Sequence, residues 1–126
     1  MHEYSFALEL VRLLREIAER YGAGRITRAR VRVGKLKQIV PSLLVPCVEV
    51  VAAEDPLLRG LVLEVEEEEI VYRCADCGLE FNASLGDLRA ACPRCGSGST
   101  ELVAGDEVTL ICVEAEEVEE DTGPQG

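Results

Sequence analysis

One pattern occurs twice in the 126-residue chain, as Cys74-Ala75-Asp76-Cys77-Gly78 and as Cys92-Pro93-Arg94-Cys95-Gly96. In each turn two residues separate the cysteines, so both sulfurs can point at one ion. The glycine after the second cysteine can take a positive φ, which lets backbone N–H groups turn toward the sulfurs. Four thiolates from two such turns make a closed tetrahedral site, which Zn2+ prefers. We predict that Cys74, Cys77, Cys92 and Cys95 bind one structural zinc ion.

Two other interpretations of these cysteines compete with zinc. The first is that the four cysteines are unrelated buried thiols, but such residues would have no reason to occur as two pairs with the same spacing. An iron site of the rubredoxin kind shares the Cys-Pro-x-Cys-Gly turn, but a closed thiolate site and a thin aromatic shell favour zinc. The remaining cysteines, Cys47 and Cys112, have no paired spacing, and we expect both to be buried small hydrophobic side chains.

The composition indicates a folded domain in a reducing compartment. Apolar residues make up 48% of the chain and charged residues 29%, which is typical of globular proteins. No apolar run approaches the roughly 20 residues of a membrane-spanning helix, and the N-terminus lacks the pattern of a signal peptide. We therefore expect a cytoplasmic protein with no membrane insertion, in which paired cysteines bind metal instead of forming disulfides.

The charge distribution is uneven and argues against nucleic acid as a partner. The net charge is −11, with nine Lys/Arg against four Asp/Glu in residues 1–46 and four against twenty in residues 47–126. Such a chain repels phosphate backbones, which disfavours a nucleic-acid-binding zinc ribbon. The basic residues within 25–37 are expected to form a strand face that pairs with the chain's own glutamates. With His2 as the only histidine, a His-centred catalytic triad is also disfavoured.

Two helices are predicted from apolar residues at helical spacing. The first covers about residues 4–21 and is ended by glycines. The second opens at Pro41-Ser42 and runs to about 54, where Asp55-Pro56 ends it; if Ser42 is the N-cap, Pro46 falls at the boundary of the first turn, where a proline costs less. Pro46 is expected to disturb it, because an interior proline removes one hydrogen bond and kinks a helix.

Three strands are predicted from alternating or continuous apolar patterns. Residues 25–36 and 61–69 alternate, as half-buried strands do, and Gly34 suggests a bulge or bend. Residues 108–118 begin apolar on both faces, which favours a central position in a sheet. The tail 122–126 has nothing to bury, so we expect it to be disordered.

The first three residues, Met1-His2-Glu3, carry a second candidate metal site. The amine of Met1, the backbone nitrogen and Nδ1 of His2 and the backbone nitrogen of Glu3 can form a plane of four nitrogens. That geometry selects Ni(II) or Cu(II) over Zn(II), and its affinity falls at low pH because amide nitrogens bind only when deprotonated. The alternative is a frayed end whose histidine contacts nothing. Taken alone, the tripeptide is a weak signal.

The order of these features resembles the HypA/HybF family of hydrogenase maturation nickel metallochaperones. The shared features, over about residues 1–120, are the Met-His-Glu start, the first helix, the strand ending in Val33-Gly34-Lys35-Leu36, the Val40-Pro41 helix start, and the cysteine turns before a last acidic strand. Two positions depart from the family pattern, Tyr4 and Pro46, and neither is a proposed ligand.

The resemblance implies an α+β fold with two helices on a three-stranded sheet and an inserted four-cysteine zinc-ribbon module. The nickel-binding domain would comprise residues 1–70 and 104–121, and the zinc ribbon residues 71–103. The implied protein is not an enzyme. It would bind Ni(II) through Met1, His2 and Glu3 and deliver it, with the GTPase HypB, to the [NiFe]-hydrogenase large subunit, or in some members to urease. The resemblance leaves open whether Glu3 contributes its carboxylate, its amide or neither.

Overall fold

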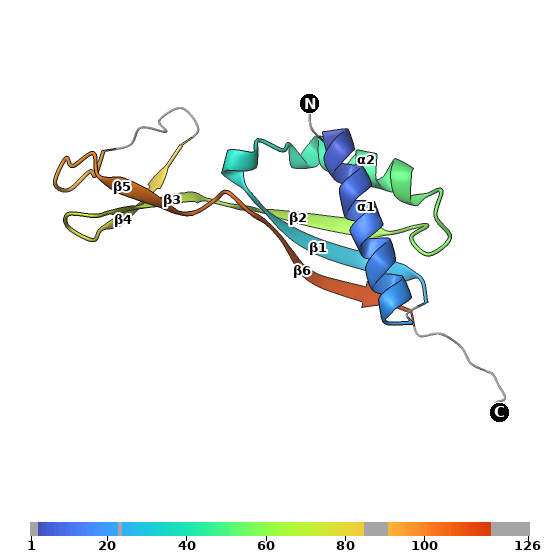
Figure 1. The fold of residues 1–126 in the computed structure, drawn as a ribbon. Helices are drawn as coiled ribbons and strands as arrows, with labels where there is room; N and C mark the ends of the chain where they lie inside the picture. Colours follow the sequence, from blue (N-terminus) through green and yellow to red (C-terminus); the bar gives the residue numbers. More distant parts are fainter. Residues whose placement is uncertain (1–2, 23, 85–90, 117–126) are drawn as a thin grey trace. The chain divides into compact units, whose positions relative to one another are not determined.

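The computed structural model describes residues 3–22, 24–84 and 91–116 (Figure 1). The predicted tail 122–126 lies outside these residues. Two α-helices, one short 3-10 helix (η1) and six strands follow in this order: α1 (Glu3–Arg20), β1 (Ile26–Gly34), η1 (Lys35–Lys37), α2 (Pro41–Ala52), β2 (Val62–Glu68), β3 (Ile70–Cys74), β4 (Glu80–Ala83), β5 (Thr100–Ala104) and β6 (Val108–Ala115).

The chain divides into two compact units. The first comprises Met1–Val31, Ile39–Val65 and Leu110–Gly126, and the second comprises Arg32–Gln38 and Glu66–Thr109. In the first unit α1 packs against α2, and Figure 1 shows the two helices side by side. The core of this unit is aliphatic, as a chain without tryptophan requires, and its fully buried side chains include Leu14, Ile26, Val31, Leu44, Val48 and Leu58.

The structure confirms both predicted helices, and the second one begins at Pro41. Val40 is the N-cap of α2, not Ser42, and Pro41 occupies the first turn. Proline suits this position because its missing N–H has no helical partner there and its φ is preset. Pro46 lies inside α2 without ending it. Its missing donor would have bonded to the carbonyl of Ser42, still within the first turns of the helix.

The three long strands form one sheet in the order β2-β1-β6. The prediction that the last strand is central was therefore wrong, because β1 is central and β6 is an edge. The expectation that Cys112 is buried was also wrong: it lies on β6, at the edge of the sheet as the described residues form it, and its side chain is exposed. Cys47 is half-buried on α2.

The basic side chains of β1 pair with the acidic side chains of β2, as predicted. Arg28 and Arg30 both form ion pairs with the carboxylate of Glu64, and the Arg30 Nη2 lies 3.1 Å from the Glu64 Oε1. Farther along the strands, the Arg32 Nε lies 2.8 Å from the Glu66 Oε2. These residues alternate along their strands, so one face of the β1–β2 pair carries a row of ion pairs. Pairs this exposed contribute little stability individually, but they neutralise these three arginines of β1.

The second unit contains a small antiparallel sheet in the order β4-β3-β5. Tyr72 of β3 faces Phe81 of β4, and their rings stack with centroids 6.2 Å apart. Together with the two helices and the larger sheet, this module confirms the predicted α+β fold class. Neither described helix combines the length and apolar character that crossing a membrane requires.

Gly34 has a different role from the predicted bulge or bend. It ends β1, where the backbone touches the backbone at Gly105, so that a Cβ at Gly34 would lie 2.2 Å from the Gly105 carbonyl carbon. Two hydrogen bonds hold the contact: Gly34 N–H donates to the Glu107 carbonyl at 2.8 Å, and Leu36 N–H donates to the Gly105 carbonyl at 2.9 Å. Only a residue without a side chain allows the two segments to meet in this way.

Candidate metal centre

The second unit brings the four predicted cysteine ligands together. Their sulfurs all lie within 4.8 Å of one another, and two pairs, Cys74 with Cys95 and Cys77 with Cys92, are 3.5 Å apart. A tetrahedral zinc ion with Zn–S bonds of about 2.3 Å separates its sulfurs by roughly 3.8 Å. The observed spacing therefore fits four ligands around one ion.

The two turns that carry the cysteines have the same backbone geometry. Gly78 and Gly96 have φ values of 81° and 77°. In each turn the glycine N–H donates to the carbonyl of the first cysteine, at 2.9 Å to Cys74 and 2.8 Å to Cys92. The positive φ predicted from the glycine positions is thus present in both turns. It closes each turn tightly enough for both of its sulfurs to face the same point.

Backbone and side-chain donors surround the sulfurs and adjust their acidity. The N–H of Leu79 and, next, the Arg94 side chain lower the pKa of the Cys77 thiol to about 6. The pKa of Cys74 is also lowered, chiefly by the backbone N–H of Cys77. The N–H of Ser97 acts in the same direction on Cys95, but Cys74 and burial outweigh it and raise the Cys95 pKa to about 12. The close sulfurs of the other three cysteines thus make ionisation of Cys95 unfavourable until a cation is present.

Arg94 is a supporting residue that the sequence interpretation did not identify. Its Nη2 donates to the Cys77 carbonyl at 3.0 Å, so a residue of the second turn holds the first turn. Its backbone N–H also points at the Cys92 sulfur, 3.4 Å away. A second bridge joins the turns where the Ser97 hydroxyl donates to Asp76 at 2.5 Å. The available signal was the position of Arg94 between two cysteines, which places its side chain next to the site.

Four sulfur ligands leave no open coordination position in a tetrahedral site. This donor set suits Zn2+, and a resident ion held by Cys74, Cys77, Cys92 and Cys95 would cross-link the two turns. Within the described ranges, these cysteines are the only group of three or more His, Cys, Asp or Glu side chains placed to share an ion. The arrangement is that of a structural site.

The predicted N-terminal site is only partly within the described chain. Met1 and His2 lie outside it, and Glu3 is its first residue. Glu3 begins α1 and is only 4% exposed, and its Oε2 accepts a hydrogen bond of 2.9 Å from the Val40 N–H. The carboxylate of Glu3 therefore holds the start of α1 against the N-cap of α2.

The sequence of this chain matches one family model along most of its length. The model is described as hydrogenase/urease nickel incorporation, metallochaperone, hypA, and it matches residues 1–115. A relative called hydrogenase maturation factor HypA, from Chlorobium limicola, is 36% identical over 117 residues, covering 93% of this chain and 98% of the relative. A protein with the same description from Desulfatibacillum aliphaticivorans is 33% identical over 121 residues, covering 95% and 91%.

The fold also resembles a solved structure. The solution structure of the Ni metallochaperone HypA from Helicobacter pylori superposes with a TM-score of 0.67 at 28% identity, covering 94% of this chain and all of that one.

Proposed function

This chain belongs to the HypA family of hydrogenase and urease nickel-incorporation metallochaperones, and from this premise we propose that it carries Ni(II) at its N-terminus. The membership confirms the predicted class, a hydrogenase maturation factor and not an enzyme. The proposed ligands are the amine of Met1, the backbone nitrogen and imidazole of His2, and the backbone nitrogen of Glu3. The observation that carries the proposal is that the family match starts at residue 1 and so includes Met1-His2-Glu3.

The surroundings of Glu3 favour its backbone nitrogen, not its carboxylate, as the nickel ligand. Its Oε2 already accepts a hydrogen bond from Val40. Its backbone N–H lies at the first position of α1, where the helix itself supplies no acceptor, and it hydrogen-bonds the residue's own carboxylate. Deprotonating and coordinating this nitrogen would leave the helical hydrogen bonds of α1 intact.

The four cysteines would hold Zn2+ as a resident ion with a structural role. Bound there, the ion supplies a cross-link between the two cysteine turns. Residues 71–103 would then act as a zinc ribbon within a nickel-binding domain of residues 1–70 and 104–121. The two metals have separate tasks, because a closed thiolate site retains its ion whereas a terminal nitrogen site can release one.

Delivery requires partners, and we propose a HypB-type GTPase and the large subunit of a [NiFe]-hydrogenase, with the cytoplasm as the place where they meet. Support for a nickel enzyme as recipient comes from the family, whose description names both hydrogenase and urease, and the GTPase is what the family resemblance implies.

The nickel site is tested by calorimetric titration of zinc-loaded protein with Ni(II). His2→Ala removes the imidazole and is expected to lower the affinity by more than about 100-fold, since even residues that only support a ligand change affinity 10–100-fold. Adding one residue before Met1 replaces the amine with an amide and should weaken binding similarly. Tyr4→Ala, next to the site but supplying no ligand, is the matched control. Unchanged affinity in both the histidine variant and the extended protein would remove the proposed site.

The same preparations separate the proposed metals. Metal analysis is expected to find one zinc per chain before nickel is added, and no iron. Iron with visible absorption in the cysteine site would support the rubredoxin-like alternative and contradict the zinc assignment.

A further inference from the structure

The four-cysteine site keeps a negative charge when it holds a divalent ion. Four thiolates outnumber the two positive charges of Zn2+, so two negative charges remain. Two of the sulfurs belong to buried residues, Cys74 and Cys92, which are 1% and 2% exposed. Water screens a buried charge poorly, and the chain as a whole carries a net charge of −11. A loaded site is therefore stabilised by positive charge from its surroundings.

Backbone N–H groups supply part of this compensation. The Cys92 sulfur lies 3.4 Å from the backbone nitrogen of Arg94 and 3.5 Å from that of Cys95. In the other turn, the Leu79 N–H donates to the Cys77 sulfur. These groups are dipoles and add no net charge, so they offset the charge of the site only in part.

The side chain of Arg94 places a full positive charge at the site. Its Nη2 donates to the Cys77 carbonyl at 3.0 Å, which holds the guanidinium against the first turn although Arg94 belongs to the second. The guanidinium also hydrogen-bonds the Cys77 thiolate. The pKa of Arg94 is raised, chiefly by Cys77, and the charges of Cys92 and Cys95 act in the same direction. One cation thus interacts with sulfurs from both turns.

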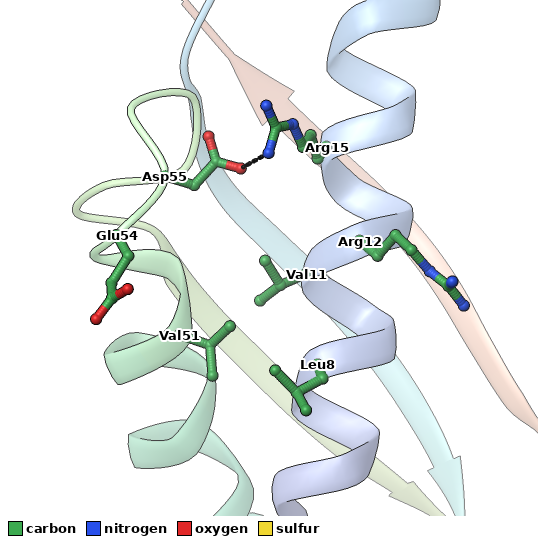
Figure 2. A pocket seen from close by; sticks show the side chains of 7 residues that line it. All are labelled: Leu8, Val11, Arg12, Arg15, Val51, Glu54 and Asp55. Atoms are coloured by element: carbon green, nitrogen blue, oxygen red, sulfur yellow. Dashed lines mark ion pairs between the residues drawn. The ribbon is translucent and has the colours of Figure 1, made fainter.

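Several other arginines of the described chain are neutralised by a carboxylate. Figure 2 shows Arg15 of α1 bound to Asp55 at 3.3 Å. In the second unit, Arg73 of β3 binds Glu80 of β4 at 2.6 Å. Among the described residues, by contrast, no carboxylate forms an ion pair with Arg94. The charge of Arg94 is therefore available to the thiolates.

Given the resident Zn2+ of the proposed function, on which this step rests, we propose that Arg94 is the counter-charge of the metal centre and sets how tightly the site retains its ion. Without zinc we expect the module to unfold, and its thiols are then largely protonated at neutral pH, since an unperturbed cysteine has a pKa of about 8.5. Loading takes the site from nearly neutral to negative, so a cation beside it favours the loaded state. Arg94 does not touch the ion and acts through the charge that it places beside the ligands.

Competition for zinc between the full-length chain and a chelating dye, at neutral pH, tests this role. Arg94→Gln removes the charge and is expected to lower the apparent zinc affinity at least about tenfold, because residues that support a metal ligand change affinity 10–100-fold. Arg94→Lys keeps the charge and is expected to recover most of the affinity. Arg73→Gln is the matched control, since it removes a cation that points to the other face of β3 from Cys74, and its affinity should stay close to the wild-type value.

The reduction potential of iron-substituted protein separates charge from a purely mechanical role. Ferric iron leaves the four-thiolate site with one negative charge and ferrous iron leaves it with two, so a neighbouring cation favours the reduced form. Arg94→Gln is expected to lower the potential, and Arg94→Lys to keep it near the wild-type value. A residue that only clamps the two turns together would leave the potential unchanged. Circular dichroism checks that each loaded variant is folded.

Wild-type zinc affinity in Arg94→Gln would overturn the proposal. Equal losses of affinity in Arg94→Gln and Arg94→Lys, with an unchanged iron potential, would overturn it as well and leave Arg94 as a clamp between the turns. A wild-type chain that takes up no zinc would overturn the zinc assignment instead, and the iron potentials would then still decide the role of Arg94.

Discussion

Replacing Gly34 by alanine is expected to destabilise the second unit strongly, although alanine normally stabilises such a position. The backbone at Gly34, with φ −67° and ψ 139°, is one that any residue adopts. The obstacle is space: the new Cβ would lie 2.2 Å from both the carbonyl carbon and the oxygen of Gly105. Ordinary contacts between such atoms are about 3.5–4.0 Å, so one backbone segment must move by more than about 1 Å.

The segment at Gly105 has little room to move. A Cβ at Gly105 itself would lie 2.7 Å from the Ile70 Cα, so the chain is packed on its other side too. Separation would break the hydrogen bonds from Gly34 to Glu107 and from Leu36 to Gly105, at about 1 kcal/mol each. Overpacking strain adds about 1–3 kcal/mol, and the lower entropy of the unfolded alanine chain offsets about 0.4–1 kcal/mol. We expect a net loss of about 2–5 kcal/mol.

Gly98→Ala is the matched control. Gly98 also lies in the second unit, its φ is not positive, and a Cβ there would meet nothing within 4 Å. The same substitution should therefore leave stability unchanged or raise it by up to about 1 kcal/mol.

Urea unfolding of the zinc-loaded proteins, followed by circular dichroism, gives the free energies. Amide exchange at residue 36 reports the contact locally, and its protection in Gly34→Ala is expected to fall by at least about tenfold. The reasoning is refuted if Gly34→Ala is as stable as the wild type, or if Gly98→Ala is destabilised equally.

Three further predictions concern the two metal regions. Removing zinc with a strong chelator is expected to abolish amide protection in β3–β5 while α1 and α2 keep theirs; loss of protection throughout the chain would contradict a separate structural role. Alkylation of the zinc-free protein, followed by mass spectrometry, should show Cys77 and Cys95 reacting alike at neutral pH, because the contacts that lower the pKa of Cys77 to about 6 and raise that of Cys95 to about 12 are lost with the fold of the module. A much faster reaction of Cys77 than of Cys95 would show that the folded arrangement of the cysteines survives zinc removal. Glu3→Ala is expected to speed amide exchange at Val40 at least several-fold, while Glu3→Gln, which keeps an acceptor oxygen, changes it less; equal effects would exclude the Glu3–Val40 hydrogen bond.

Features determined over a few residues could be predicted from the sequence. The cysteine turns depend on spacing and on the glycine that follows, and both turns form as expected. Helix α1 follows from its apolar period, which places Leu10 and Leu14 on the buried side. The pairing of Arg28 with Glu64 was foreseeable because one strand is basic, the other is acidic, and both alternate.

Features that depend on distant contacts could not be predicted in this way. The position of β6 at the sheet edge depends on which strands pair, and the apolar pattern of residues 108–113 is compatible with either place. The N-cap of α2 is Val40, whose N–H is satisfied by a carboxylate 37 residues earlier in the chain. The close approach of Gly34 to Gly105 likewise joins segments that no local pattern relates.

X-ray absorption at the nickel edge of protein loaded with one Ni(II) per chain tests the nickel-carrying role most directly, with the zinc edge recorded on the same sample. We expect four nitrogen ligands in a planar arrangement around nickel, no sulfur, and four sulfurs still around zinc. Sulfur ligands on nickel, together with loss of sulfur around zinc, would place nickel among Cys74, Cys77, Cys92 and Cys95 and contradict nickel carriage by Met1-His2-Glu3. Six oxygen or nitrogen ligands around nickel would contradict the planar four-nitrogen site.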